Sequence, residues 1–338
     1  MSDSDFSAFT RWADRELGIA DAKIVRELSG GNSNLTRLVE STAGLMVMRS
    51  APVSKISPKA HLGVQREAAF MGALAGHAPV PKVVAWCDNP DIVGQPFALV
   101  EYIDGLSITN EMPQPYSAVE DVNKLGLDLA SALGQIAIAP WKDIGLGDWG
   151  RPDNFLLRQI ERWLGIRRDQ PTRDLPEIER LGQWLLENVP VEGPVGVVHG
   201  DYHLDNSLCH PRRPELLAVI DWEMATIGDP LSDLGLFLMF WGPRAIDPPG
   251  FAHVQGVTRV EGVLSRAELA AAWAATSGLS TDHLNFYLCF AFWRLAAIVE
   301  GAYGLFLEGK VNTPYARGLE ADVPALLHEA ALAARGEW

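Results

Sequence analysis

The sequence predicts an α+β protein with two lobes. The small N-terminal lobe is expected to hold an antiparallel sheet and one helix, and the larger C-terminal lobe to be mainly helical. Two observations favour this plan: the first hundred residues carry short apolar runs with one helical interlude, whereas most of the rest is patterned as helix. A chain of 338 residues with 48% hydrophobic residues is long enough for two cores. We place the boundary where the apolar run 98–103 meets the turn signal Asp104-Gly105, giving lobes of residues 1–103 and 104–338.

In the first lobe, a glycine-rich turn separates the apolar runs 24–28 and 35–39. Its residues are Ser29, Gly30, Gly31, Asn32, Ser33 and Asn34. Glycines let a backbone approach a ligand closely, and the amides and hydroxyls of this turn can donate to phosphate oxygens. A Gly-Gly hairpin turn explains the same residues without any ligand, so the segment alone leaves both interpretations open.

Arg49 ends the next apolar run, and a helix is expected to start near residues 57–58, a Ser-Pro pair. One stripe of this helix, at steps of three and four, consists of Val64, Glu67, Met71 and Leu74. A carboxylate on a buried stripe needs a partner, and Arg49 is the candidate. The alternative is that Glu67 is partly exposed and pairs with Lys59 or Arg66 on its own helix.

The second lobe carries two polar clusters, each directly after a short β-branched run. Asp201 and Asn206 follow the run 195–198, and Asp221 follows the run 216–220, so all three should lie at strand ends. A carboxylate can take the proton of an acceptor hydroxyl, and amide and carboxylate oxygens bind Mg²⁺. The spacing from Asp201 to Asn206 is that of the protein-kinase catalytic loop, with Asp221 at the position of the metal-binding Asp. Each residue alone could cap a turn, but the combination predicts phosphoryl transfer from Mg-ATP.

These residues resemble the aminoglycoside phosphotransferase family of small-molecule kinases, and in particular the branch of kinase domains fused to acyl-CoA dehydrogenases. The similarity runs from about residue 25 to 315 and is carried by the segments 29–34, 145–152, 199–206, 220–234 and 292–301. The resemblance implies a protein-kinase-like two-lobed fold with ATP and Mg²⁺ as cofactors. It also implies a small-molecule hydroxyl as acceptor, on a hydroxy acid, a hydroxyacyl-CoA or an aminoglycoside-like compound.

The resemblance also implies roles for individual residues. Backbone groups around Glu101 and Ile103 would bind adenine at the connection between the lobes. Arg49 stands where protein kinases carry a phosphate-binding lysine; it keeps the charge, but its planar fork differs from a lysine ammonium. His199 is expected to anchor the catalytic loop, and Asp233 to support that loop through hydrogen bonds. The other reading of Asp233 is a charge favourably placed near a helix start.

Composition and charge exclude several classes of protein. The formal net charge of −15, from 28 basic and 43 acidic residues, disfavours a nucleic-acid partner. The apolar stretch 284–307 contains Arg294 and Glu300, which favours a buried helix over a membrane span. The N-terminus lacks a secretory signal pattern, and three cysteines without metal-ligand spacing are typical of reduced thiols. We therefore expect a cytoplasmic protein, with no prediction of its oligomeric state.

Several questions stay open at this level. Arg294 and Glu300 could form a structural pair or anchor a substrate. His203, Asp205 and Glu223 receive no role. A nucleotide-binding regulator without transferase activity is the first alternative function, and a metal-dependent phosphohydrolase is a weaker second.

Overall fold

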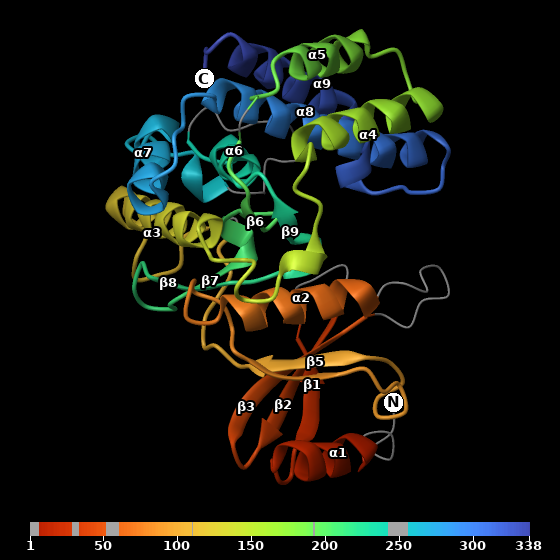
Figure 1. Ribbon diagram of the computed structural model, residues 1–338, viewed down its shortest axis with the longest axis vertical. Helices are drawn as coiled ribbons and strands as arrows, with labels where there is room; N and C mark the ends of the chain where they lie inside the picture. The colour runs from red at the N-terminus through yellow and green to blue at the C-terminus, as the bar shows by residue number, and fades with distance from the viewer. Residues whose placement is uncertain (1–6, 29–33, 52–60, 110, 192, 243–255) are drawn as a thin grey trace.

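The structure, a computed structural model, describes residues 7–28, 34–51, 61–109, 111–191, 193–242 and 256–338. Within these residues the N-terminal part is an antiparallel sheet with a helix on each face, and the rest of the chain is mainly helical (Figure 1). The predicted α+β, two-lobed plan is confirmed. The lobe boundary at residue 103 stays a prediction; it falls in the segment after the strand β5 (Phe97–Glu101).

The N-terminal sheet has five strands in the order β1-β2-β3-β5-β4. Besides β5, the strands are β1 Lys23–Glu27, β2 Leu35–Ser41, β3 Gly44–Ser50 and β4 Val83–Cys87. Strand alternation divides the side chains of β5 between two cores: Phe97 and Leu99 pack toward α1 (Ser7–Leu17), while Ala98 packs toward α2 (His61–Leu74). The helix α2 lies between this sheet and the second lobe (Figure 1).

The predicted stripe on α2 is buried along its whole length, from Val64 through Glu67 and Met71 to Leu74. The Ser-Pro pair expected to start this helix lies outside the described residues. The other helix of this lobe, α1, was not predicted, although its buried residues Phe9, Trp12 and Ala13 recur at helical spacing. It covers the face of the sheet opposite to α2 (Figure 1).

The second lobe combines helices with two short antiparallel ribbons, β6 with β9 and β7 with β8. The helices are α3 Val119–Ala137, α4 Phe155–Asp169, α5 Pro176–Glu187, α6 Leu231–Met239, α7 Arg266–Ser277, α8 Leu284–Leu307 and α9 Pro314–Ala334. The strands are β6 Gly196–Val198, β7 Ser207–Cys209, β8 Leu216–Val219 and β9 Thr226–Gly228. Single 3₁₀ turns are η2 Gly147–Trp149, η3 Leu204–Asn206, η4 Trp222–Met224 and η5 Gly256–Thr258.

The helix α8 is the centre of the second lobe, where it packs against α4, α5, α6 and α9. Among the described residues it is the one helix long and apolar enough to cross a bilayer by length and composition. Its burial among four other helices is that of a core helix, as expected from the sequence.

Direct contacts join α2 to the segment that follows β8. Arg66 Nη1 donates to the carbonyl oxygen of Ala225 at 2.7 Å, and the rings of Phe70 and Trp222 stack with centroids 6.4 Å apart. Because η4 lies directly after Asp221, these contacts hold the end of β8 against the first lobe.

Candidate active site

The catalytic loop predicted from the sequence connects β6 to β7. Asn206 Nδ2 donates to both the carboxylate Oδ2 and the carbonyl oxygen of Asp201, each at 2.9 Å. Gly200 has φ +88°, and a Cβ atom there would lie 2.8 Å from the carbonyl oxygen of Met224. Glycine is therefore required at this position, both by the backbone conformation and by the close approach of η4.

The β7–β8 ribbon brings Asp221 to the same place. Its register pairs Ser207 with Val219, and one step further the Ile220 N–H donates to the Asn206 carbonyl oxygen at 2.9 Å. Asp221 follows with φ +68°, a left-handed conformation that is uncommon for a residue other than glycine and that clusters at active sites. The structure thus brings together Asp201, Asn206 and Asp221.

Arg49 reaches this group from β3. Its Nε and Nη2 atoms contact Glu67 Oε2 and Oε1 at 3.1 and 3.0 Å, and Nη1 donates to Thr36 Oγ1 at 2.9 Å. Nη2 also lies 3.4 Å from Asp221 Oδ1. The predicted Arg49–Glu67 pair is therefore present, and the local pairs of Glu67 with Lys59 or Arg66 are not needed to satisfy it. Burial lowers the pKa of Arg49, but the charges of Glu67 and Asp221 outweigh burial and raise it above its ordinary value.

Comparison with known proteins identifies the family of this chain. The family model described as "Phosphotransferase enzyme family" matches residues 24–270, which is more than half of the chain. The chain belongs to the phosphotransferase enzyme family. It is 32% identical to mouse (Mus musculus) acyl-CoA dehydrogenase family member 10 over 290 residues, covering 85% of this chain and 27% of the mouse protein. The chain thus spans about a quarter to two fifths of the length of the curated relatives it matches.

Solved structures agree on the fold of this phosphotransferase. A provisionally assigned aminoglycoside phosphotransferase from Ralstonia eutropha is 28% identical, with a TM-score of 0.84 and coverage of 97% of this chain and 98% of that one. The complex of APH(2'')-IIIa with GDP and kanamycin is 18% identical, with a TM-score of 0.63 and coverage of 96% and 98%, and shows similarity of fold alone. The chain therefore has the fold of these phosphotransferases over nearly its whole length.

His199 joins the two halves of the candidate site through hydrogen bonds. Its Nε2 lies 2.9 Å from the Ile220 carbonyl oxygen, and its Nδ1 accepts from the Asp201 N–H at 3.3 Å. These partners require the neutral tautomer with the proton on Nε2. Complete burial lowers the pKa of His199 to about 4, so the ring is neutral at physiological pH. The ring thus fixes the loop before Asp201 to the strand before Asp221, which is the anchoring contact expected from the sequence.

Asp233, near the start of α6, supports the same loop. Its carboxylate accepts from the N–H groups of His199 and Gly200 at 2.5 and 2.9 Å. Burial raises the pKa of Asp233 to about 6, although these two hydrogen bonds oppose the shift. The hydrogen bonds predicted for this residue are present.

Arg294 holds the loop from a third side. Its Nη2 donates to the carbonyl oxygen of Gly200 at 3.1 Å, and its guanidinium lies over the ring of Phe290. Glu300 points to different partners: Arg173 at 3.0 Å and the hydroxyl of Thr172. Of the two interpretations left open, Arg294 contacts the catalytic loop, whereas Glu300 belongs to a structural ion pair elsewhere on α8.

His203 and Asp205, which received no role from the sequence, control the charge of Asp201. His203 Nε2 lies 3.4 Å from Asp201 Oδ1, and Nδ1 lies 3.7 Å from Asp205 Oδ1. Burial lowers the pKa of His203, but hydrogen bonds and charge from both carboxylates outweigh burial and raise it to about 9. Burial raises the pKa of Asp201. His203, together with His199 and Asn206, outweighs burial and lowers this pKa to about 2. Asp201 is therefore a carboxylate at neutral pH.

The glycine loop is only partly described: Ser29, Gly30, Gly31, Asn32 and Ser33 lie outside the described residues. Asn34 is described, and its Nδ2 donates to Glu223 Oε2 at 2.9 Å. Glu223, unassigned from the sequence, therefore links the end of this loop to η4.

The residues predicted to contact adenine are the last residue of β5, Glu101, and Ile103, two residues further on. The Glu101 N–H donates to the Lys82 carbonyl oxygen at 2.9 Å, and Glu101 Oε1 accepts from the Lys82 N–H at 2.8 Å. The Ile103 carbonyl oxygen accepts from the Gly105 N–H at 2.9 Å. Within the described part of the chain, no backbone carbonyl accepts from the Ile103 N–H. This N–H is therefore free to donate to a ligand.

The donor set around Asp221 fits Mg²⁺. Asn206 uses its amide nitrogen toward Asp201, which leaves the amide oxygen as a possible ligand, and the Asp221 side chain is 35% exposed with only Oδ1 close to Arg49. The described residues contain no group of three or more His, Cys, Asp or Glu side chains arranged for a metal. Two oxygen ligands suit Mg²⁺, which usually keeps waters and binds substrate phosphates in addition to one or two protein groups.

Proposed function

We propose that this phosphotransferase moves the γ-phosphate of ATP, with Mg²⁺, to a hydroxyl group of a small molecule. One observation carries the proposal: Asp201, Asn206 and Asp221 occupy one site, where Asp201 is held ionised beside the amide and carboxylate that suit a metal ion. This is the set of groups that phosphoryl transfer needs, because its protein part is mainly positioning and charge stabilisation.

Each residue then has a defined task. Asp201 orients the acceptor hydroxyl and accepts its proton. Bound Mg²⁺, held by Asn206 and Asp221, would supply positive charge that stabilises the phosphates. Arg49, positioned by Glu67, adds a fixed cation beside Asp221. The backbone after β5, near Ile103, would bind adenine.

For the acceptor we propose a hydroxylated metabolite, such as a hydroxy acid or a hydroxyacyl-CoA. The curated relatives include acyl-CoA dehydrogenase family members, and this supports acyl chemistry around the reaction. An aminoglycoside-like acceptor is the alternative, since APH(2'')-IIIa binds kanamycin. The net charge of −15 does not decide between them, because global charge says little about one site.

Phosphorylation of a hydroxy-compound panel with radiolabelled ATP tests the proposal. The panel contains hydroxy acids, hydroxyacyl-CoA thioesters and aminoglycosides. We expect label on an acceptor of the first two classes, dependent on Mg²⁺ and lost in Asp201→Asn. The exposed Asp143→Asn serves as the matched control and should keep full activity. Label on an aminoglycoside alone would support the alternative acceptor.

The same experiment separates the alternative functions. Arg49 in place of lysine, and its contact with Asp221, are the observations that favour a nucleotide-binding regulator. A regulator would bind Mg-ATP without labelling any acceptor, and a phosphohydrolase would release inorganic phosphate without one.

We also propose a cytoplasmic location. Cys87, Cys209 and Cys289 are free and buried, which is compatible with a reducing compartment. We propose no nucleic-acid or membrane partner; cell fractionation tests both the location and membrane association.

A further inference from the structure

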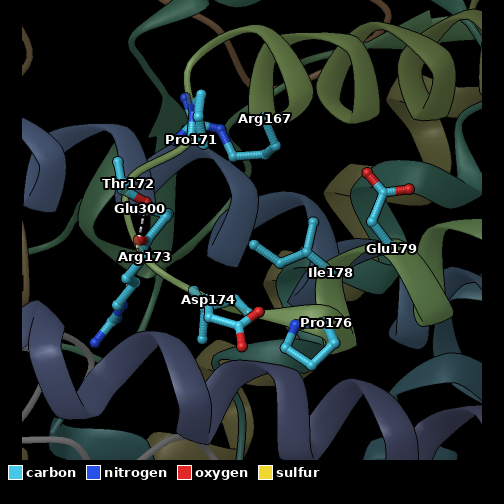
Figure 2. Close-up of a pocket in the computed structure, with 10 residues that line it drawn as sticks. Arg167, Pro171, Thr172, Arg173, Asp174, Pro176, Ile178, Glu179 and Glu300 are labelled. Atoms are coloured by element: carbon cyan, nitrogen blue, oxygen red, sulfur yellow. Dashed lines mark hydrogen bonds and ion pairs between the residues drawn. The ribbon is translucent and has the colours of Figure 1, made fainter.

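A cavity of about 200 Å³ lies where α4 connects to α5, against the C-terminal half of α8 (Figure 2). The residues of the site around Asp201 do not line it. The polar side chains that line it are Arg167, Thr172, Arg173, Asp174, Glu179 and Glu300. The cavity is therefore separate from the groups assigned to phosphoryl transfer.

Arg167 is the unusual member of this group. The residue is 9% exposed, and its Nε and Nη1 atoms are buried without a hydrogen-bond partner among the described residues. A buried, unpaired guanidinium is unfavourable because its lost hydration is not replaced. Burial lowers the pKa of Arg167, an effect that the charge of Glu300 only partly offsets. Arg167 Nε and Nη1 thus lack the hydrogen-bonded anion that a buried arginine usually has.

The buried carboxylate that lines the cavity already has partners. Glu300 receives Arg173 Nη2 at 3.0 Å and the hydroxyl of Thr172. Figure 2 shows Glu300 turned toward these two residues. Arg173 is also committed, since it donates to the carbonyl oxygens of Glu320 at 2.8 Å and Leu319 at 3.1 Å. Glu300 therefore acts on Arg167 through its charge but accepts no hydrogen bond from Arg167 Nε or Nη1.

The other acidic side chains at the cavity are directed to solvent or to other cations. Asp174 is exposed, so water screens its charge. Glu179 is exposed, and its Oε1 and Oε2 accept hydrogen bonds from Arg168 Nε and Nη2 at 2.9 and 2.8 Å. Neither carboxylate neutralises Arg167.

Backbone features around the cavity are compatible with an anion. α5 begins at Pro176, which lines the cavity and has no N–H, so the open donors at the cavity are those of Arg167. On α8, a Cβ atom at Gly301 would lie 3.3 Å from Arg167 Nη2, so glycine leaves room for the guanidinium. A cation with free donors and the space for an anion beside it therefore meet in this cavity.

We propose that this cavity binds a small molecule that carries a carboxylate or a phosphate, with the oxyanion paired to Arg167. Both anions present the planar or tetrahedral oxygens that a guanidinium recognises through two hydrogen bonds. The proposal does not depend on the nature of the phosphoryl acceptor.

Calorimetric titration with two probes, inorganic phosphate and acetate, at ionic strength matched by chloride, tests the proposal and separates the two anions. We expect saturable binding of at least one probe to the wild type. Arg167→Met should weaken it at least tenfold, whereas Arg168→Met, the exposed neighbour, should leave it unchanged. Arg167→Lys, which keeps the charge and loses the fork, provides the comparison if Arg167→Met does not fold; it should bind more weakly than the wild type.

Three results would overturn the proposal. The first is binding no stronger than that of chloride. The second is equal affinity in the wild type and the Arg167 variants. The third is a crystal grown with selenate in which only water contacts Arg167.

Discussion

Replacing Glu67 by leucine tests the reasoning about the buried ion pair. Glu67 and Arg49 side chains are 3% and 15% exposed, and two hydrogen-bonding atoms of Arg49 face Glu67. Removing one partner of a buried pair typically costs about 3–5 kcal/mol, because the other charge is left uncompensated. Arg49 would keep Thr36 and Asp221, so we expect the low end, about 3 kcal/mol of unfolding free energy. Urea denaturation measures this value.

The same variant should also impair catalysis. Without Glu67, the nearest carboxylate to Arg49 is Asp221, now 3.4 Å away. A tighter Arg49–Asp221 contact would compete with the metal, so KM for Mg-ATP should rise. The exposed pair Arg168–Glu179 provides the control, and Glu179→Leu should change stability by at most about 1 kcal/mol. A Glu67→Leu variant with wild-type stability and wild-type KM would refute the argument.

Three further predictions concern the catalytic loop. Asp201→Asn should lower kcat by about 10²–10⁴-fold with little change in unfolding temperature, as expected for loss of a general base. Steady-state kinetics and differential scanning calorimetry measure the two quantities. A large fall in unfolding temperature together with the loss of kcat would indicate a purely structural role instead. Arg294→Met leaves the Gly200 carbonyl without its donor, at a cost of about 1–3 kcal/mol, and should reduce kcat more than KM for ATP; equal effects on both would contradict a positioning role. The pKa of His203 is raised to about 9 in the folded protein, so its protonation stabilises the fold. This contribution is complete below the pKa of an unfolded histidine, near 6.5, and is lost as the pH rises through 9. The urea midpoint should therefore fall between these pH values, and His203→Gln should make the midpoint depend less on pH.

Much of the fold and the central site followed from local sequence patterns. The spacing of Asp201 to Asn206, and the β-branched runs before both clusters, placed these residues at strand ends because strand ends and turns are encoded by neighbouring residues. The burial of Glu67 on a helical stripe predicted its pairing with Arg49 for the same reason: a periodic pattern fixes a face, and a charge on that face needs a partner.

Partners that are backbone atoms or distant residues left no such signal. Arg294 contacts the carbonyl of Gly200, 94 residues away, and a carbonyl has no residue identity to read. The Asp201–His203–Asp205 cluster depends on the path of a short loop, which alternation alone does not define. The helix α1 carried a readable pattern, with Phe9, Trp12 and Ala13 at helical spacing, but it is short, at 11 residues. The roles of residues 29–33 stay predictions.

The short segment after β8 has an additional consequence for mutational studies. Three side chains of the first lobe contact this segment: Asn34 contacts Glu223, Arg66 contacts Ala225, and Arg49 contacts Asp221. Residues that share partners do not contribute independently, so the effects of paired substitutions here should depart from simple sums. Double-mutant cycles across these three contacts would therefore measure the free energy of coupling between the N-terminal and the C-terminal lobe.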